Sequence, residues 1–358
     1  MSEPARTTTA EGADPTIIGP YLAAQLGDEA WLDCTLDLIA GGRSNLTYLV
    51  SGRDGAEAVL RRPPLGHVLP TAHDMAREFR ILSALAGSSV PVPQPLHLCT
   101  DPDVLGVTFY VMQRVHGHIV RNRFPAGYAD EPYIRSTIGR ALIDTLVDLH
   151  AIDYGSAGLG DFGHPEGFMQ RQLRRWTQQW EKSKTRALPM MDDLIARLDA
   201  EMPTSSSPSI VHGDFRLDNT VLDPNAPGTI AAVLDWEMST LGDPLSDLGM
   251  MLVYWPQEDD AAEFKESFGS ITATGVAGFP TREDVVERYA ERSGRDVESA
   301  YYYWAFGFFK LAVIAEGIHA RFLQGKTLGK GFETFGERVP PLIGLGGWVL
   351  DRKHVGAI

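Results

Sequence analysis

The sequence predicts an α+β fold in two lobes, a small β-rich lobe followed by a larger and mainly helical one. In the first third of the chain, apolar runs of strand length alternate with glycine- or proline-rich turns. Further on, apolar residues recur at helical spacing. The length of 358 residues also favours two lobes around a cleft, because it is long for one simple domain. We expect a disordered tail over residues 1–15, the β-rich lobe with a preceding helical segment over 16–115, and the helical lobe over 116–358.

The first predicted elements are two strands with a glycine-containing loop between them, over residues 36–50. Adjacent glycines allow the backbone of such a loop to approach a phosphate closely and to cap it with amide groups. A plain hairpin turn is the alternative interpretation of the same pattern. The loop residues concerned are Gly41, Gly42, Arg43, Ser44 and Asn45.

The next strand is predicted over residues 56–62, and a helix follows over residues 73–85. Because strand side chains alternate between faces, Arg61 shares a face with Val59. Apolar residues at helical spacing form a stripe on the helix, and Glu78 lies beside that stripe. A solvated glutamate on the helix surface is the alternative for this position.

Later elements are a strand within residues 109–117 and three helices, over residues 133–150, 168–180 and 301–321. The second helix is basic and aromatic, which is unusual in an acidic chain. The third helix is apolar on most sides, so its charged residues need partners. We expect Lys310, Glu316 and Arg321 to pair with one another rather than to line an acceptor site.

The most informative motif is His212-Gly213-Asp214, with Asn219 five residues beyond the aspartate and Asp235 after the apolar run 230–234. A carboxylate can accept a hydroxyl proton, and amide and carboxylate oxygens suit Mg²⁺. Turn residues separate the two parts of the motif, so we expect base and metal ligands on adjacent strand ends. The arrangement indicates phosphoryl transfer from ATP, with Asp214 as base and Asn219 and Asp235 as magnesium ligands.

These residues resemble the aminoglycoside phosphotransferase and choline kinase-like superfamily, and most closely the kinase-like domains fused to some animal acyl-CoA dehydrogenases. The resemblance covers about residues 36–321 and implies a bilobal protein-kinase-like fold that phosphorylates a hydroxyl with ATP. It does not imply aminoglycoside resistance. The residues that carry it are His212-Gly213-Asp214 with Asn219, Asp235-Trp236-Glu237, Gly242-Asp243-Pro244 and Asp247-Leu248. Asp243 and Asp247 are interpreted as structural.

The resemblance also implies roles for residues of the first lobe. Arg61 would replace the strand lysine that holds the nucleotide phosphates in kinases, and Glu78 would fix its position. The loop over residues 41–45 would cover the phosphates. Main-chain groups of Met112, Gln113 and Arg114 would contact the adenine edge.

We expect the acceptor to be a small molecule with a hydroxyl group. The sequence constrains the chemical class of this acceptor less than it constrains the type of reaction. Basic residues of the 168–180 helix, Arg171, Arg174 and Arg175, could bind an anionic acceptor, although a solvated basic surface is an equal alternative. The resemblance favours a hydroxy acid or its acyl-CoA ester over an aminoglycoside, amino-alcohol or sugar. A silent module that binds nucleotide or acyl-CoA without turnover is the alternative of another class.

The composition limits the classes of binding partner that we expect. A net charge of −15 argues against nucleic acid and anionic membrane surfaces, since both require basic surface. The two cysteines, Cys34 and Cys99, form no disulfide framework or zinc site, as in a reducing cytoplasm. No signal peptide or long apolar segment is apparent. We therefore expect a cytoplasmic protein, and the sequence leaves the oligomeric state open.

Overall fold

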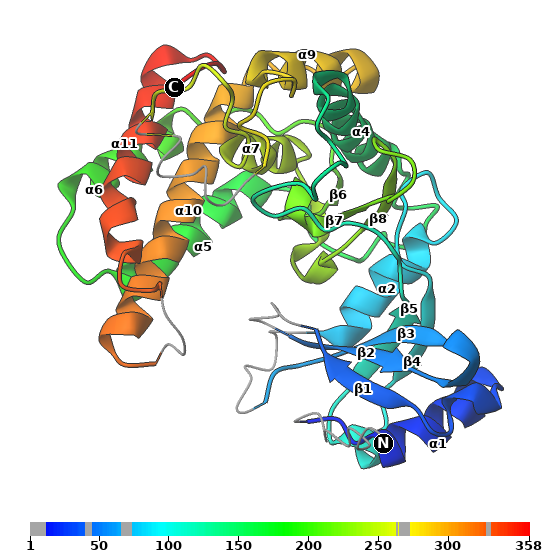
Figure 1. Cartoon of the computed structure of the whole chain (residues 1–358). Helices are drawn as coiled ribbons and strands as arrows, with labels where there is room; N and C mark the ends of the chain where they lie inside the picture. Colours follow the sequence, from blue (N-terminus) through cyan, green and yellow to red (C-terminus); the bar gives the residue numbers. More distant parts are fainter. Residues whose placement is uncertain (1–11, 40–44, 66–73, 263, 265–272, 327–330) are drawn as a thin grey trace. The chain divides into compact units, whose positions relative to one another are not determined.

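The computed structural model describes residues 12–39, 45–65, 74–262, 264, 273–326 and 331–358 (Figure 1). The chain divides into two compact units. Unit 1 comprises Met1–His116 and Ala231–Glu237, and unit 2 comprises Gly117–Ile230 and Met238–Ile358. The short segment Ala231–Glu237, which contains Asp235, thus belongs to the first unit although it follows much of the second in the sequence.

Unit 1 is built on a five-stranded sheet with strand order β1-β2-β3-β5-β4. All neighbouring strands are antiparallel. The strands are β1 (Thr35–Leu38), β2 (Leu46–Ser51), β3 (Glu57–Arg62), β4 (Pro95–Cys99) and β5 (Phe109–Gln113). Helices α1 (Pro15–Leu26), α2 (Met75–Leu85) and α3 (Pro102–Leu105) accompany them, with short 3₁₀ turns η1 (Glu29–Trp31) and η2 (Arg53–Gly55).

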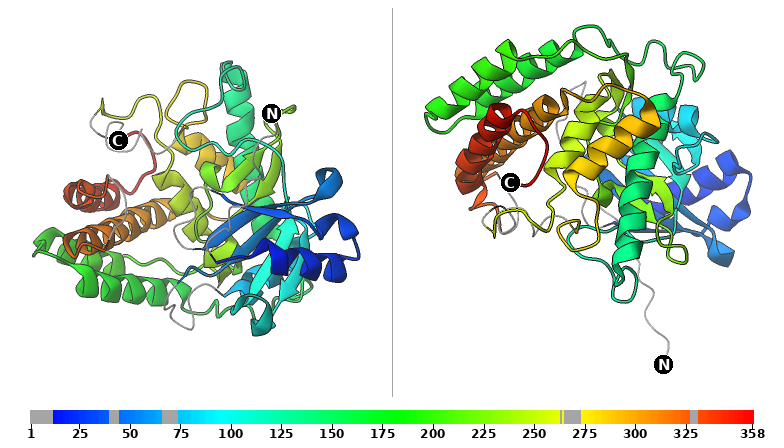
Figure 2. Two further views of the ribbon diagram at one scale, coloured as in Figure 1. Left: turned by 60° about the horizontal axis from the view of Figure 1, so that its bottom comes forward. Right: turned by 90° about the horizontal axis from the view of Figure 1, so that it is seen from above.

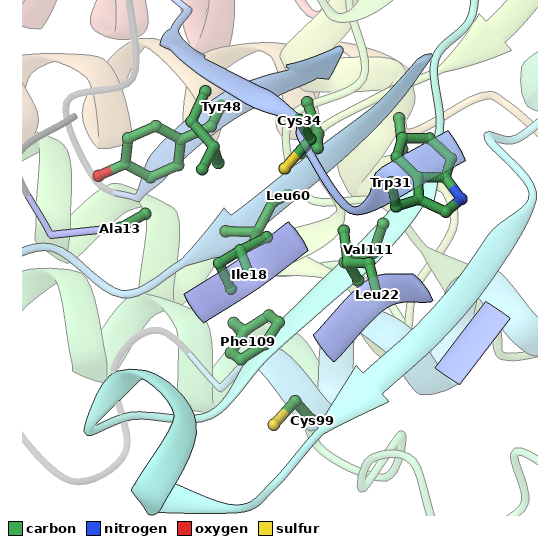
Figure 3. Close-up of a cluster of buried hydrophobic side chains, with 13 residues drawn as sticks. Ala13, Ile18, Leu22, Trp31, Cys34, Tyr48, Leu60, Cys99, Phe109 and Val111 are labelled. Carbon is green, nitrogen blue, oxygen red and sulfur yellow. The ribbon is translucent and has the colours of Figure 1, made fainter. Parts of the chain in front are cut away.

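The two faces of this sheet have different neighbours. Ile18 and Leu22 of α1 pack on one face against Leu60 and Val111 in a buried apolar cluster (Figure 3). Helix α2 contacts β4 and β5. Because side chains alternate along a strand, Arg61 points away from the face that Leu60 occupies. The opposite face is therefore left for Arg61 of β3 and Glu78 of α2.

The predicted disordered tail is wrong for its last residues, whereas residues 1–11 lie outside the described part of the chain. Ala13 is buried in the apolar cluster of unit 1. The Asp14 side chain accepts a hydrogen bond from the Thr16 amide and caps α1. The small and polar composition of this segment gives no sign of that packing.

Unit 2 is mainly helical. Its helices are α4 (Pro132–Ala151), α5 (Phe168–Ser183), α6 (Pro189–Ala200), α7 (Leu245–Val253), α9 (Arg282–Ser293), α10 (Ala300–Leu323) and α11 (Phe335–Arg352). Helix α10 contacts α5, α7 and α11, and Figure 2 shows the long helices α5, α6, α10 and α11 side by side. The α+β prediction is confirmed. No helix among the described residues has the length and apolar character needed to cross a membrane.

Short strands and turns carry the motif residues between these helices. Strand β6 (Ser209–Val211) pairs antiparallel with β9 (Thr240–Gly242). The 3₁₀ turn η3 (Leu217–Asn219) leads into β7 (Thr220–Leu222). Strand β8 (Ile230–Val233) and the 3₁₀ turn η4 (Trp236–Met238) flank Asp235.

Helices α7 and α10 approach each other closely at two glycines. A Cβ on Gly249 would lie 2.4 Å from the Tyr303 backbone, and one on Gly307 would lie 2.6 Å from a Val253 methyl group. Real Cβ atoms do not approach backbone this closely, so the crossing requires glycine on both helices. Close packing here fixes the positions of Asp247 on α7 and Lys310 on α10.

We predict that Gly249→Ala lowers the free energy of unfolding by about 1–3 kcal/mol, because the added methyl group overpacks the crossing. Urea unfolding followed by fluorescence measures the loss. Gly347→Ala on α11 is the matched control, since a Cβ there meets no atom within 4 Å. An unchanged midpoint for Gly249→Ala would show that the helices can separate at little cost.

Candidate active site

In unit 1, one guanidinium joins three carboxylates. Arg61 Nε lies 3.0 Å from Glu78 Oε2, and its Nη2 lies 2.6 Å from Asp235 Oδ1 and 3.5 Å from Glu237 Oε2. The Arg61 side chain is only 12% exposed. The structure therefore brings the predicted strand cation and helix glutamate together, and it adds the predicted metal ligand to the same cluster.

Glu78 is the most buried member of this cluster, at 2% exposure. It accepts hydrogen bonds from Asn45 Nδ2 (3.1 Å) and from the Tyr110 hydroxyl (3.0 Å). Burial raises the pKa of Glu78 to about 7, although Arg61 and Tyr110 oppose this shift. Glu78 is thus held by one ion pair and two hydrogen bonds within unit 1.

Asn45 ends the predicted phosphate loop and is tied to the same cluster. Its Nδ2 also donates to Glu237 Oε2 at 3.0 Å. The remaining loop residues, Gly41, Gly42, Arg43 and Ser44, lie outside the described residues. Asn45 therefore connects the start of β2 with the segment that carries Asp235.

Asp235 has a left-handed backbone conformation, with φ of 65°, two residues after the end of β8. The buried Trp236 indole donates to the Val233 carbonyl at 3.0 Å and stabilises this turn. The Asp235 side chain is 35% exposed and binds Arg61 through Oδ1. Three carboxylates around one guanidinium leave an excess of negative charge, which fits a divalent cation.

Glu237 has no predicted role, although it belongs to the Asp235-Trp236-Glu237 motif of the sequence. The available signal was its spacing: a second carboxylate two residues after Asp235, the predicted metal ligand. The contacts of Glu237 with Asn45 and Arg61 arise between segments far apart in the sequence. Spacing alone could not have identified those partners.

In unit 2, the backbone of the His212-Gly213-Asp214 turn is held from both sides. The amides of His212 and Gly213 donate to Asp247 Oδ2 (2.6 Å) and Oδ1 (2.7 Å). On the other side, Lys310 Nζ donates to the Gly213 carbonyl at 2.9 Å. Gly213 has φ of 86°, and a Cβ there would lie 2.8 Å from Met238, so the turn requires glycine.

Asp214 itself is 28% exposed and has two polar neighbours. Asn219 Nδ2 donates to its Oδ2 (2.9 Å) and to its carbonyl oxygen (2.8 Å). Arg216 Nε lies 3.3 Å from Oδ2 and 3.0 Å from Asp218 Oδ1, and its guanidinium stacks on Tyr254. Because the side-chain nitrogen of Asn219 faces Asp214, the side-chain amide oxygen of Asn219 is the atom left to bind a hard cation.

Asp247 is supported by a buried network, which agrees with a structural role. His150 Nε2 lies 3.3 Å from Asp247 Oδ2, and His150 Nδ1 lies 2.8 Å from the Tyr289 hydroxyl. Burial lowers the pKa of His150. Asp243 is also structural, because it accepts hydrogen bonds from Tyr303, Ser206 and the Leu245 amide.

The three arginines predicted at an acceptor site do not gather in one place. The Arg171 guanidinium donates to the carbonyl groups of His164 and Glu166 and so stabilises the preceding loop. Arg174 lines a groove between α5 and α6. Arg175 lies over the Trp176 ring and acts electrostatically on Lys310. Of the three, Arg175 interacts with a residue that contacts the Asp214 turn, namely Lys310.

The predicted pairing of Lys310, Glu316 and Arg321 is wrong for the first two residues. Lys310 contacts the Gly213 carbonyl and lies 5.5 Å from the Trp176 ring centroid. Glu316 accepts from the Thr185 amide and hydroxyl, both at 2.7 Å. Lys310 and Glu316 therefore contact two different neighbouring segments.

The strand predicted to contact adenine is β5. Met112 lies in register with Val59 and Pro95, and the Gln113 amide donates to the Gln94 carbonyl at 2.8 Å. The Gln113 N–H is therefore already used within unit 1. Arg114 follows the strand, and its guanidinium pairs with Glu57.

The α+β fold, the His212-Gly213-Asp214 turn and the Asp235 segment are those of a kinase-like phosphotransferase. The chain belongs to the phosphotransferase enzyme family, whose profile matches residues 35–275. It is a small-molecule kinase by class. The family and the resemblance to kinase-like domains fused to acyl-CoA dehydrogenases are thereby confirmed.

The chain is 36% identical over 318 residues to acyl-CoA dehydrogenase family member 11 of Rattus norvegicus, covering 86% of this chain and 39% of the relative. It is 35% identical over 330 residues to family member 10 of Mus musculus, covering 91% and 30%. The chain thus spans well under half the length of these curated relatives.

Solved structures show the same fold. A Ralstonia eutropha protein assigned as an aminoglycoside phosphotransferase has a TM-score of 0.79 and 30% identity, covering 95% of this chain and 98% of that one. Aminoglycoside phosphotransferase APH(4)-Ia, solved with ADP and hygromycin B, has a TM-score of 0.58 and 14% identity, covering 95% and 99%. At that identity the second match supports the fold alone.

We predict that Arg61→Met lowers the free energy of unfolding by about 3–5 kcal/mol, because it leaves Glu78 and its neighbours without their cation. Arg61→Lys should lose less, since it keeps the charge but not the several donors. Denaturant unfolding measures both. Arg53→Met, which removes an exposed pair with Asp33, should cost about 1 kcal/mol or less. Equal losses at Arg53 and Arg61 would contradict the importance of the buried cluster.

A second prediction concerns pH. Burial lowers the pKa of His150 in the folded state, so only the unfolded chain gains this proton just below about pH 6.5. The His150 contribution to stability is therefore present above that pH and is lost as the pH falls through it. Denaturant midpoints between pH 8 and pH 5 should fall more steeply for the wild type than for His150→Gln. Parallel curves would show that His150 does not cause acid destabilisation.

Proposed function

We propose that this protein transfers the γ-phosphoryl group of ATP to a hydroxyl of a small anionic molecule, with Mg²⁺ as cofactor. The observation that carries the proposal is the placement of Asp214, whose backbone turn is fixed by Asp247 and whose carboxylate is oriented by Asn219. A partly exposed carboxylate in a rigid turn suits a base that must accept a hydroxyl proton. Family membership supports the same reaction class.

In this proposal Asp214 orients the acceptor hydroxyl and takes up its proton. The Asn219 carbonyl oxygen and the Asp235 carboxylate would hold Mg²⁺, which supplies charge neutralisation at the phosphates. Both are hard oxygen donors. Magnesium sites usually contain only one or two protein carboxylates, and this pair supplies one carboxylate and one neutral amide oxygen.

Arg61 would hold the nucleotide phosphates, and Glu78 would keep it oriented for that contact. Arginine can bind phosphate oxygens through two parallel hydrogen bonds, so it can serve where kinases usually have lysine. Asn45 would anchor the end of the phosphate loop through Glu78 and Glu237. Several kinase-fold neighbours were solved with ATP or ADP, which supports ATP as the phosphoryl donor.

For the acceptor we propose a hydroxy acid or its acyl-CoA ester. The named relatives are acyl-CoA dehydrogenase family members, which favours an acyl substrate class. Lys310 and Arg216 contact the Asp214 turn, and Arg175 acts electrostatically on Lys310. These cations attract an anion and disfavour a polycationic aminoglycoside. An aminoglycoside, amino-alcohol or sugar is the second candidate for the acceptor, because the Ralstonia eutropha protein, 30% identical to this chain, is assigned as an aminoglycoside phosphotransferase.

The proposal predicts acceptor-dependent release of ADP from Mg·ATP, tested with hydroxy acids, their CoA esters, amino-alcohols, sugars and aminoglycosides. Asp214→Asn keeps the side-chain shape and should lower kcat roughly 10²- to 10⁴-fold, because it removes the base. Its nucleotide affinity, measured by titration calorimetry, should stay near that of the wild type. Nucleotide binding without turnover on any acceptor would instead support a silent binding module.

A further inference from the structure

The Glu78 carboxylate is contacted by three groups, of which two form aligned hydrogen bonds. Its Oε1 accepts from Asn45 Nδ2 at 3.1 Å, and its Oε2 accepts from the Tyr110 hydroxyl at 3.0 Å. Arg61 Nε also lies 3.0 Å from Oε2, but within the described residues this buried N–H is not aligned for a hydrogen bond. The Arg61 contact is therefore a charge interaction that constrains direction little. The orientation of Glu78 depends on its two aligned donors.

Tyr110 lies where the strand that carries Arg61 meets the helix that carries Glu78. Strands β3 and β5 pair in the sheet of unit 1, and α2 contacts β5 (Figure 1). Tyr110 is directly opposite Arg61 in this pairing, so both side chains leave the same face of the sheet. The Tyr110 ring packs against Phe79 of α2, with ring centroids 6.2 Å apart. One side chain thus contacts two adjacent residues of α2 and lies beside Arg61.

The hydroxyl of Tyr110 contributes more than packing. The residue is 2% exposed, and phenylalanine would fill the same space without burying a polar group. A buried tyrosine hydroxyl usually has a hydrogen-bond partner, and here the partner is the Glu78 carboxylate. Burial, together with the nearby Glu78, raises the pKa of Tyr110 above its usual value, so the hydroxyl keeps its proton and donates. The hydrogen bond is therefore what distinguishes tyrosine from phenylalanine at this position.

Arg61 has one terminal nitrogen available for a ligand. Its Nη2 contacts Asp235 Oδ1 at 2.6 Å, and its Nε faces Glu78. Among the described residues Nη1 has no hydrogen-bond partner, so it is the group left for a phosphate oxygen. The direction of Nη1 follows from the plane of the guanidinium, which Asp235 and Glu78 hold at the other two nitrogens. A rotation of Glu78 would tilt that plane and move Nη1.

We propose that Tyr110 is a positioning residue of the nucleotide site. Its hydroxyl fixes Glu78, Glu78 fixes the guanidinium plane of Arg61, and Arg61 then meets the nucleotide phosphates in a set orientation. This inference rests on the proposed function, in which Arg61 binds those phosphates, and it adds a residue that acts through Glu78 rather than by touching the nucleotide. A lysine ammonium has no plane to orient, so the need for this support follows from the arginine at position 61.

The test compares a nucleotide with the nucleoside that lacks its phosphates. Titration calorimetry measures the Kd of Mg·ADP, and ligand-observed NMR measures that of adenosine. Tyr110→Phe should raise the Kd of Mg·ADP roughly 3- to 10-fold, the range expected for one lost hydrogen bond to a charged group. The Kd of adenosine should change less than about twofold. In turnover assays the KM for ATP should rise by the same factor as the Kd of Mg·ADP, with the KM for the acceptor unchanged.

A matched control and a spectroscopic signal separate positioning from folding. The Tyr302 hydroxyl in unit 2 donates to the Leu198 carbonyl at 2.7 Å, and Tyr302 is 0% exposed. Tyr302→Phe therefore loses a comparably buried hydrogen bond and should leave both Kd values unchanged. In the nucleotide-free protein, the Nε–H resonance of Arg61 can be assigned by its absence from Arg61→Lys. This resonance should shift in Tyr110→Phe and stay in place in Tyr302→Phe.

The possible outcomes distinguish the role of Tyr110 from the kinase proposal. Equal weakening of Mg·ADP and adenosine binding by Tyr110→Phe would overturn the positioning role and leave Tyr110 as a packing residue. An unchanged Kd for Mg·ADP would also overturn it, while turnover by the wild type would keep the kinase proposal intact. Selective loss of Mg·ADP affinity in a protein that phosphorylates no acceptor would support the role of Tyr110 and refute the kinase proposal. A wild type that binds no Mg·ADP would refute both.

Discussion

The ion-pair cluster at Arg61 is the constraint on which the organisation of unit 1 depends. One guanidinium contacts Glu78 from α2 and both Asp235 and Glu237 from the segment after β8. Asp235 and Glu237 lie more than a hundred positions beyond Arg61 and Glu78 in the sequence. A buried cation with several partners is costly to disrupt, since any separated carboxylate would remain desolvated. The cluster therefore accounts for the inclusion of Ala231–Glu237 in unit 1.

A corresponding constraint operates in unit 2 at the Asp214 turn. Here the backbone is held: Asp247 accepts the two amides before Asp214, and Lys310 donates to the carbonyl of Gly213. Both side chains come from helices whose crossing is fixed by Gly249 and Gly307. Because backbone groups at a rigid turn cannot relax independently, the helix packing determines where the Asp214 carboxylate points.

Much of the fold and of the candidate site could be predicted from the sequence. The wrong predictions share a physical cause. Local periodicity placed Arg61 on one face of its strand and Glu78 beside the apolar stripe of its helix, and the family resemblance implied that the two residues pair. The partner of Lys310 could not be predicted in this way, because it is the main-chain carbonyl of Gly213, which helix packing brings near. Pairing with Glu316 was also geometrically poor: six residues along a helix place side chains about 120° apart. The burial of Ala13 depends equally on tertiary contacts that its composition does not encode.

The substitution of arginine for the usual strand lysine has a consequence for Asp235, the proposed metal ligand. A lysine ammonium is a compact charge on a flexible chain, whereas the arginine fork can contact Glu78 and Asp235 through different nitrogen atoms at the same time. Arg61 does this with Nε and Nη2 and engages only Oδ1 of Asp235. In the proposed function, the second carboxylate oxygen of Asp235 would be the one that binds the cation. Arginine thus holds the aspartate in one orientation before nucleotide binds, and a metal ion would not have to order it.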